Sequence, residues 1–213
     1  EQNGDDFVIT GTKHFISYAD VADYIILFAA SGVEETARGK KKRITSFLID
    51  KDTPGLTVAK GSRSVSHRGF HHCELVFDKA RVNKRQVLGE VHKGFDVANT
   101  WLGATRLTVA AQCVGRAQRA LEMATQWAAT RKQFGQTIGK FQGTSFKLAD
   151  MATEIECANL IVLQTAWKTD QGTAQDQDYA MAKLFATEML ARVTDQTVQI
   201  FGGMGLMEET GVE

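Results

Sequence analysis

The spacing of hydrophobic residues changes once along the chain, near residue 90. Before that point, short apolar and β-branched runs alternate with turn residues, which predicts strands at 7–10, 12–17, 24–30, 44–50, 56–60 and 73–78. After it, apolar residues recur at spacings of three and four, as on one face of an amphipathic helix. The pattern predicts an α+β fold: half of an antiparallel sheet or barrel, followed by an antiparallel helical bundle.

Three helical faces follow from this spacing. The first consists of Leu107, Ala110, Val114, Ala117, Leu121, Ala124 and Ala128. The second consists of Leu148, Ala152, Ile155, Ala158 and Val162, and the third of Tyr179, Ala182, Ala186, Met189, Val193 and Ile200. The single proline, Pro54, lies in the β half, so no proline breaks these helices. We expect two domains, 1–90 and 91–213, divided near 89–94.

Composition excludes several classes of protein. With 213 residues, of which 43% are hydrophobic, the chain can bury one large core or two small ones. Lys+Arg and Asp+Glu both number 25, so no net charge favours nucleic acid or an acidic membrane surface. The one basic cluster, KKKR at 40–43, is expected to be a solvated loop between strands, with a docking patch as the alternative.

Membrane and redox features are also limited. No apolar run approaches the roughly 20 residues that a membrane-spanning helix needs. The start shows no signal-peptide pattern, but because it already reads as the middle of a domain, this says nothing of a targeting sequence upstream. The three cysteines, Cys73, Cys113 and Cys157, are far apart and odd in number, which argues against a disulfide framework and suits a reducing compartment. We expect them to be buried free thiols.

Candidate chemistry appears where the first two helical patterns meet, at RKQFG (131–135) followed by Phe141 and Gln142. The guanidinium of Arg131 is a planar fork of donors that suits a diphosphate. Phe134 supplies an apolar face, and Gln142 can both donate and accept hydrogen bonds. An arginine and lysine pair is also ordinary at a helix C-terminus. Capping, however, requires neither the aromatic nor the glutamine.

Two further strings carry possible binding groups. The first string is Gln199 followed by three glycines, Gly202, Gly203 and Gly205. Glycine after a helix is most often a cap, but these glycines would also let a ligand approach the backbone. The string GTKHFIS (11–17) reads as a tight turn into a strand with Phe15 and Ser17 on one face and Ile16 on the other. That ring and hydroxyl could stack on a ring system and hydrogen-bond its edge. The alternative is a phenylalanine packed in a core.

Together, in order and spacing, these three strings resemble the acyl-CoA dehydrogenase family of flavoenzymes, over nearly the whole chain. The resemblance implies FAD as cofactor, contacted by Phe15, Ser17, Arg131, Gln133, Phe134, Gln142, Gln199, Gly202 and Gly203. In that family the arginine, phenylalanine and second glutamine touch the FAD of the neighbouring subunit, which implies a homo-oligomer, a dimer or tetramer. Most members have tryptophan and threonine where this chain has Phe15 and Ser17.

The resemblance also implies a reaction. A carboxylate removes the α-proton of an acyl-CoA while the β-hydrogen leaves as hydride to the flavin, giving the trans-2-enoyl-CoA, and electrons pass to an electron-transfer flavoprotein. Leu102 and Arg106 match positions near the substrate, although a buried salt bridge is the alternative for Arg106. Thr105 stands where one branch has its catalytic glutamate, and Gly103 where several relatives have an aspartate that binds the pantetheine arm.

Because threonine cannot abstract that proton at neutral pH, no catalytic residue is assigned in this chain, and the base is expected beyond Glu213. The chain then corresponds to part of the middle β-domain and most of the C-terminal helical domain. The resemblance implies the bacterial cytoplasm or the mitochondrial matrix. Alternatives are an oxygen-using relative, such as an acyl-CoA oxidase or flavin monooxygenase, and a non-catalytic fragment or helical interaction module. Acyl chain length and branching cannot be read.

Other sites are disfavoured. Gly32 and Gly39 enclose six residues, but no Ser or Thr follows Lys40, so a phosphate loop is not predicted, and no GxGxxG follows a strand. The HHC string at 71–73 places neighbours on opposite strand faces with no second ligand pair at zinc spacing, so no metal site is expected. Glu208 and Glu209, beside a glycine turn, are read as a solvated link.

Overall fold

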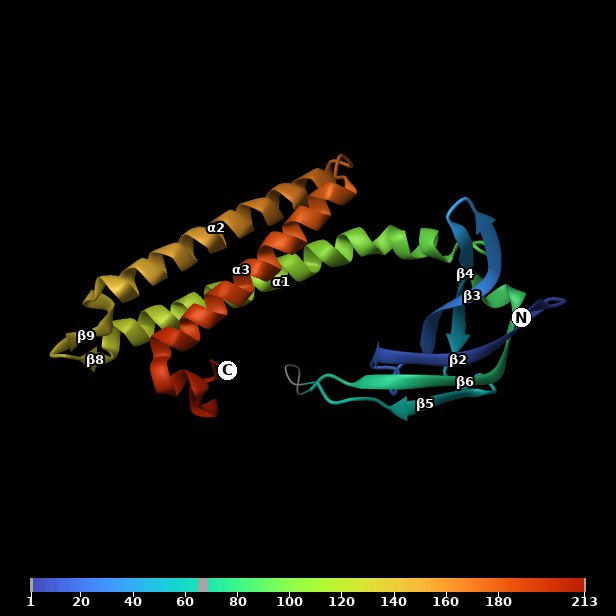
Figure 1. Cartoon of the computed structure of the whole chain (residues 1–213), viewed down its shortest axis with the longest axis horizontal. Helices are drawn as coiled ribbons and strands as arrows, with labels where there is room; N and C mark the ends of the chain where they lie inside the picture. The colour runs from blue at the N-terminus through green and yellow to red at the C-terminus, as the bar shows by residue number, and fades with distance from the viewer. Residues whose placement is uncertain (1, 65–68, 213) are drawn as a thin grey trace. The chain divides into compact units, whose positions relative to one another are not determined.

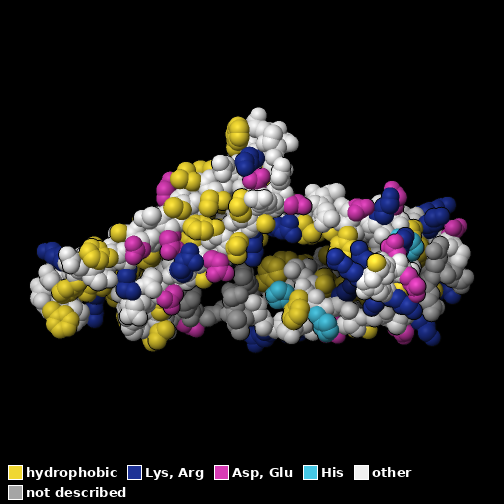
Figure 2. Space-filling model, turned by 45° about the horizontal axis from the view of Figure 1, so that its top comes forward, with side chains coloured by type: hydrophobic (Ala, Val, Ile, Leu, Met, Phe, Trp, Pro, Cys, Tyr) yellow, Lys and Arg dark blue, Asp and Glu magenta, His cyan; other side chains and the backbone are white. Residues whose placement is uncertain are grey.

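The computed structural model describes residues 2–64 and 69–212, and we refer to it as the structure. The chain divides into two compact units, Glu1–Thr100 and Trp101–Glu213, and each is described by itself (Figure 1). The predicted domain boundary at residue 90 stays a prediction. No helix among the described residues is both long and apolar enough to cross a membrane. On the face drawn in Figure 2, acidic and basic side chains are intermixed, in keeping with the zero net charge.

The first unit consists of two antiparallel sheets. One has the order β1-β2-β6-β5, formed by β1 (Gln2–Asn3), β2 (Asp6–Ser17), β6 (His72–Asn83) and β5 (Leu56–Lys60). The other has the order β3-β4-β7, formed by β3 (Tyr24–Thr36), β4 (Gly39–Asp50) and β7 (Val87–Leu88). A short 3-10 helix, η1 (Lys84–Gln86), joins β6 to β7. The sheets are separate, so the barrel alternative is not realised.

The core of this unit lies between the inward faces of its strands. Its largest fully buried side chains include Leu27, Phe47, Ile49 and Leu75. Phe7 of β2 meets Phe47 of β4 edge to face, with ring centroids 5.1 Å apart, so an aromatic pair joins the two sheets.

Three expectations about the β half are wrong in detail. The strands predicted at 7–10 and 12–17 are one strand, β2, because Gly11 pairs with Phe77 at a register irregularity and makes no turn. The strands predicted at 24–30 and 44–50 extend into one long hairpin. The KKKR cluster lies within β4 and not in a loop, where Arg43 pairs with Glu34 of β3 at 3.1 Å. Opposite charges across the hairpin allow a basic run to form a strand.

The second unit is built on three long helices: α1 (Gly94–Thr130), which begins before the unit does, α2 (Gln142–Asp170) and α3 (Asp176–Phe201). Between α1 and α2 lie β8 (Lys132–Gln133), β9 (Gln136–Thr137) and the 3-10 helix η2 (Ile138–Lys140). After α3 follow η3 (Gly202–Leu206) and η4 (Glu208–Thr210). The predicted helical faces form one hydrophobic cluster, with two exceptions: Tyr179 is not part of it, and Ala152 is exposed, with Met151 buried in its place.

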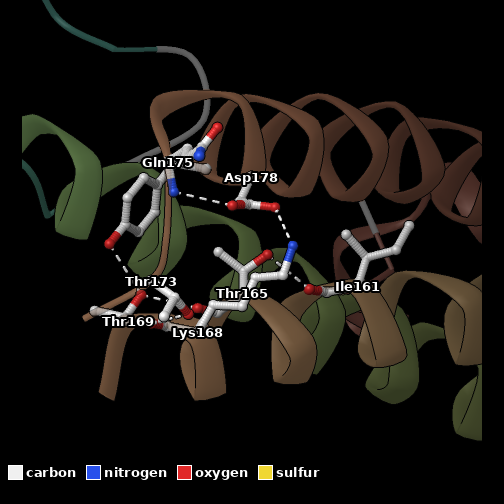
Figure 3. A network of polar contacts seen from close by, with 8 residues as sticks. Ile161, Thr165, Lys168, Thr169, Thr173, Gln175 and Asp178 are labelled. Atoms are coloured by element: carbon white, nitrogen blue, oxygen red, sulfur yellow. Dashed lines mark hydrogen bonds and ion pairs between the residues drawn. The ribbon is translucent and has the colours of Figure 1, made fainter. Parts of the chain in front are cut away.

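A polar network holds the corner between α2 and α3 (Figure 3). Lys168 donates to Asp178 at 2.6 Å, and the backbone N–H of Gln175 donates to the other carboxylate oxygen of Asp178 at 2.9 Å. These hydrogen bonds, with that from Lys168 first, lower the pKa of Asp178 below its ordinary value of 3.8. The carboxylate therefore caps the N-terminus of α3 and joins it to α2.

All three cysteines are free thiols, as predicted, but the prediction that all are buried is wrong for one of them. Cys73 and Cys113 are buried, but Cys157 is exposed on α2. Burial raises the pKa of the Cys113 thiol, although Arg116 and Lys183 act in the opposite direction.

Candidate functional site

The first candidate site lies at the corner between α1 and α2. There β8 pairs with β9, Gln133 opposite Gln136, which leaves Phe134 and Gly135 as a two-residue turn. Both have positive φ, 52° and 81°, as a type I′ hairpin turn requires. Phe134 meets the ring of Phe141 edge to face at 6.3 Å, yet its side chain remains 92% exposed. A bulky residue at positive φ is strained. Because the ring of Phe134 is so exposed, its packing contacts offset little of this strain.

Arg131 is tied to the distant glycine string through two aromatic rings. Its guanidinium carbon lies 5.9 Å from the ring centroid of Trp127, which stands four positions earlier on α1. Trp127 stacks on Phe201 at the end of α3, with centroids 4.7 Å apart and planes 13° apart. Gly202 directly follows Phe201. The stack thus joins two strings that the sequence separates by most of the helical unit.

The glycines of that string have different roles. Gly202 ends α3 at φ 63°, and its N–H donates to the carbonyls of Val198 and Gln199. A Cβ at Gly202 or Gly203 would meet nothing within 4 Å, so the space beside both is open. A Cβ at Gly205 would lie 2.6 Å from the carbonyl oxygen of Val198, so Gly205 is required by the fold. Open backbone at the first two glycines is what close approach of a ligand needs.

The remaining predicted residues of this corner are exposed. Gln133 lies in β8, Gln142 begins α2, and Gln199 lies in the last turn of α3. The hairpin and a single 3-10 turn bring Arg131, Gln133, Phe134 and Gln142 to one corner. A Cβ at Gly139 would lie 3.0 Å from the carbonyl oxygen of Ala128, so the 3-10 turn packs closely on α1.

The second candidate site lies at the end of β2 in the first unit. Ile16 packs against the core while Phe15 and Ser17 are exposed, although Phe15 lies in a register irregularity between Lys13 and Ile16, where regular alternation is interrupted. Phe15 is 72% exposed at φ 58°, so packing in a core, the alternative from sequence, is wrong. Ser17 pairs with His72 of β6, and directly opposed residues of an antiparallel pair share a face.

Sequence reasoning missed the aromatic neighbours of both sites. Trp127 has a recognisable signal, because it lies one helical turn from Arg131, the spacing at which helical side chains meet. Phe201 and His72 have none, since stacking between helix ends and pairing between strands depend on the tertiary fold.

An acidic group lies close to the second site. Oδ2 of Asp20 lies 2.7 Å from Nδ1 of His71. Partial burial raises the pKa of Asp20, but the hydrogen bond and charge of His71, with hydrogen bonds from its own backbone and from Cys73, lower it by more, so the net shift is downward. No three His, Cys, Asp or Glu side chains gather at metal-binding distance within the part of the chain that the structure describes.

Comparison with known families decides the identity. Residues 92–213 match the model of the acyl-CoA dehydrogenase C-terminal domain, and residues 1–80 match that of the acyl-CoA dehydrogenase middle domain. The chain belongs to the acyl-CoA dehydrogenase family. Members of this family are flavoprotein oxidoreductases of fatty acid metabolism, and tetramers are typical of it.

Individual relatives of this chain agree with its assignment to the acyl-CoA dehydrogenase family. The probable acyl-CoA dehydrogenase YngJ of Bacillus subtilis is 41% identical over 99% of this chain and 55% of its own length. The structure of butyryl-CoA dehydrogenase from Megasphaera elsdenii matches with a TM-score of 0.88 at 39% identity, over 98% of this chain and 54% of that one. The prolyl acyl carrier protein oxidase AnaB matches with a TM-score of 0.90 at 30% identity, over 99% of this chain and 55% of that one. The chain spans about half the length of the curated relatives it matches.

Two positions of α1, Thr105 and Gly103, are those at which the resemblance led us to expect a difference from some family members. The hydroxyl of Thr105 donates to the carbonyl of Trp101 at 3.0 Å, as threonine often does within a helix. A Cβ at Gly103 would lie 3.2 Å from two ring atoms of Tyr179, so this tyrosine crowds the space that an aspartate side chain would need. Arg106 is exposed, which excludes a buried salt bridge as its role.

Proposed function

We propose that the protein to which this chain belongs binds FAD and uses it to dehydrogenate an acyl-CoA thioester at its α and β carbons, forming the trans-2-enoyl-CoA. The observation that carries the proposal is the exposed ring of Phe134, held at positive φ beside Arg131 in a chain of the acyl-CoA dehydrogenase family. We expect the electrons to pass to an electron-transfer flavoprotein.

The donor set at the helical corner fits a dinucleotide. The guanidinium of Arg131 offers two parallel donors to a diphosphate, and its charge persists at any physiological pH. Phe134 offers an apolar face, and Gln142 offers both a donor and an acceptor. The open backbone at Gly202 and Gly203 admits a close approach. We propose that Gln133 and Gln199, exposed at the same strings, add polar contacts.

The end of β2 fits the ring system of a flavin. When bound, FAD supplies the acceptor for the hydride that leaves the β carbon of the substrate. Phe15 would cover one face of that ring and exclude water, and the hydroxyl of Ser17 would donate to its polar edge. We propose that Leu102 and Arg106 contact the substrate from α1.

Proton removal requires a group that we place outside this chain. A threonine hydroxyl is not a base at neutral pH, and the hydroxyl of Thr105 already donates to the helix backbone. Hydrogen bonds to the thioester carbonyl would stabilise the charge that develops as the α-proton leaves.

The test is an absorption spectrum of the protein expressed from the longest open reading frame that encodes this chain. We expect flavin bands, and anaerobic addition of acyl-CoA thioesters of different length should bleach them. The variant Arg131→Lys, which keeps the charge but loses the planar fork, should bind FAD more weakly. A colourless protein that takes up no added FAD would refute the proposal. The isolated 213-residue chain should bind FAD poorly and show little turnover.

A second candidate is oxidation with oxygen as the acceptor. The observation that favours it is the match to the prolyl acyl carrier protein oxidase AnaB, which covers this chain as fully as the dehydrogenases do. Both candidates share the cofactor residues, so the rate at which oxygen reoxidises the reduced protein separates them: rapid reoxidation indicates the oxidase.

Assembly is part of the proposal. If Arg131, Phe134 and Gln142 reach the FAD of a neighbouring subunit, the flavin-loaded protein is a homodimer or homotetramer. Light scattering on the loaded protein tests this, and a flavin-containing monomer would contradict it.

A further inference from the structure

His72 lies at the second candidate site in a position that no motif signals. It is the first residue of β6 and is paired with Ser17. Its ring meets that of Phe15 edge to face, with centroids 6.4 Å apart, and that of Phe70 at 5.0 Å. His72 thus contacts both residues of β2 that are proposed to contact the cofactor ring, one by strand pairing and one through its ring.

The polar atoms of this imidazole are not all satisfied. Nδ1 of His72 is buried and has no hydrogen-bond partner among the residues that the structure describes. Buried polar atoms nearly always have a partner, so an exception calls for an explanation. Two neighbouring histidines differ: Nδ1 of His71, which directly precedes β6, is 2.7 Å from Asp20, and Nδ1 of His14 in β2 is 3.4 Å from Glu74.

A cavity of ligand size borders His72, although neither Phe15 nor Ser17 lines it. The residue borders a cavity of about 540 Å³ that is also lined by Phe70, Lys60, Arg63 and the pair of Asp20 and His71. A cavity of this size, with a few polar groups and an aromatic wall, is typical of a small-molecule site.

We propose that His72 is a further positioning residue of the FAD site, with its Nδ1 hydrogen-bonded to the polar edge of the cofactor ring beside Ser17. The inference rests on the proposed function, because it takes FAD as the ligand of Phe15 and Ser17. The rings of Phe15 and Phe70 hold the imidazole, and the cofactor supplies the partner that Nδ1 lacks. The cost of burying an unpaired nitrogen is then recovered on binding.

Two substitutions separate the ring of His72 from its nitrogen. His72→Phe keeps the aromatic contacts and removes Nδ1, whereas His72→Asn keeps a polar atom at the δ position and removes most of the ring. We expect His72→Phe to weaken FAD binding about tenfold, the effect of one lost hydrogen bond to a buried group, and to shift the flavin absorption bands. Its melting temperature should stay equal or rise, since an unpaired buried atom is removed. His72→Asn should bind FAD more tightly than His72→Phe.

The matched control is His14→Phe, the same substitution on the neighbouring strand, where Nδ1 already has a carboxylate within reach. The ring of His14 lies 6.2 Å from that of Phe15, and phenylalanine keeps an aromatic ring there, so the substitution should leave the affinity and the flavin spectrum unchanged. Titration of the apoprotein with FAD, monitored by flavin fluorescence and by the absorption spectrum, measures each variant.

The outcomes distinguish this inference from the proposed function. If the unmodified protein binds FAD and His72→Phe binds it with the same affinity and spectrum, the inference is overturned while the proposed function stands. If His14→Phe weakens binding as much as His72→Phe, the effect is a general one and the inference is overturned as well. If the unmodified protein takes up no FAD, both fall.

Discussion

The substitution Phe134→Asn tests whether the exposed turn at the helical corner exists for a ligand or for the fold. Asparagine followed by glycine is the preferred pair for a type I′ turn, because both residues adopt positive φ readily. The change therefore improves the local backbone fit while it removes the only aromatic group of the turn. Fold and ligand binding should respond with opposite signs.

The expected magnitudes follow from the geometry. Relief of strain at φ 52° is worth on the order of 1 kcal/mol. Loss of the edge-to-face contact with Phe141 costs about 0.5–1.5 kcal/mol. The free energy of unfolding should thus change by less than about 1 kcal/mol. Because the side chain is 92% exposed, nearly all of its surface is available for burial by a ligand, which is worth about 1.5–3 kcal/mol. FAD binding should weaken by about tenfold to a hundredfold.

Urea unfolding and FAD titration of the same preparation measure both quantities. The control is Phe146→Asn, which removes another exposed phenylalanine of the helical unit, from α2, and should leave FAD affinity unchanged. The reasoning fails if Phe134→Asn binds FAD normally. It also fails if this variant loses more than about 2 kcal/mol of stability, because the ring would then serve the fold.

Further predictions concern the helical unit. Met189→Ala removes a fully buried side chain and should cost about 2–5 kcal/mol, whereas Met181→Ala, at an exposed position of the same helix, should cost less than about 0.5 kcal/mol by urea unfolding. Gly205→Ala should destabilise by about 1–3 kcal/mol through the clash at 2.6 Å, while Gly203→Ala should fold normally and weaken FAD binding. Because the pKa of Asp178 is lowered in the folded state, its contribution to stability is present above pH 3.8 and is lost as the pH falls further. In Asp178→Asn, the melting temperature should therefore depend less on pH in the range below 3.8.

Each of these has an outcome that contradicts it. Equal losses for the two methionine variants would show that the buried cluster is not where α3 derives its stability. A stable Gly205→Ala protein would mean that the turn relaxes at little cost. An unchanged pH profile in Asp178→Asn would show that the ion pair with Lys168 contributes nothing to folding.

Helical phases were predictable because they depend on burial alone. The faces drawn from sequence on α1 and α3 are those that pack together, since repeated apolar spacing leaves one arrangement that removes them from water. The error on α2, Ala152, arose where a small residue and its neighbour Met151 both suit the pattern. Periodicity cannot choose between adjacent positions when one side chain contributes little area.

Charge was a poorer guide than hydrophobicity. The KKKR run was expected in a solvated loop between two strands. In the structure the acidic residues of β3 lie opposite it, and this compensation is visible only once the hairpin register is known.

The candidate sites were predictable as strings but not as constellations. Arg131 and Phe134 are three positions apart in sequence, so a short local segment is enough to bring them to one corner. The stack of Trp127 on Phe201 and the placement of His72 beside Ser17 arise from packing between elements far apart in the chain. Local sequence patterns do not predict such contacts.

The stack of Trp127 on Phe201 makes the intrinsic tryptophan fluorescence a probe of this corner. Of the three tryptophans, Trp101 and Trp167 are exposed, and Trp127 alone is sheltered against another ring. Indole emission shifts to shorter wavelength when water is excluded. The short-wavelength part of the fluorescence should therefore come from Trp127, whose ring lies against the guanidinium of Arg131. A flavin that binds at that corner should quench the short-wavelength emission first, so its occupancy can be followed without a label.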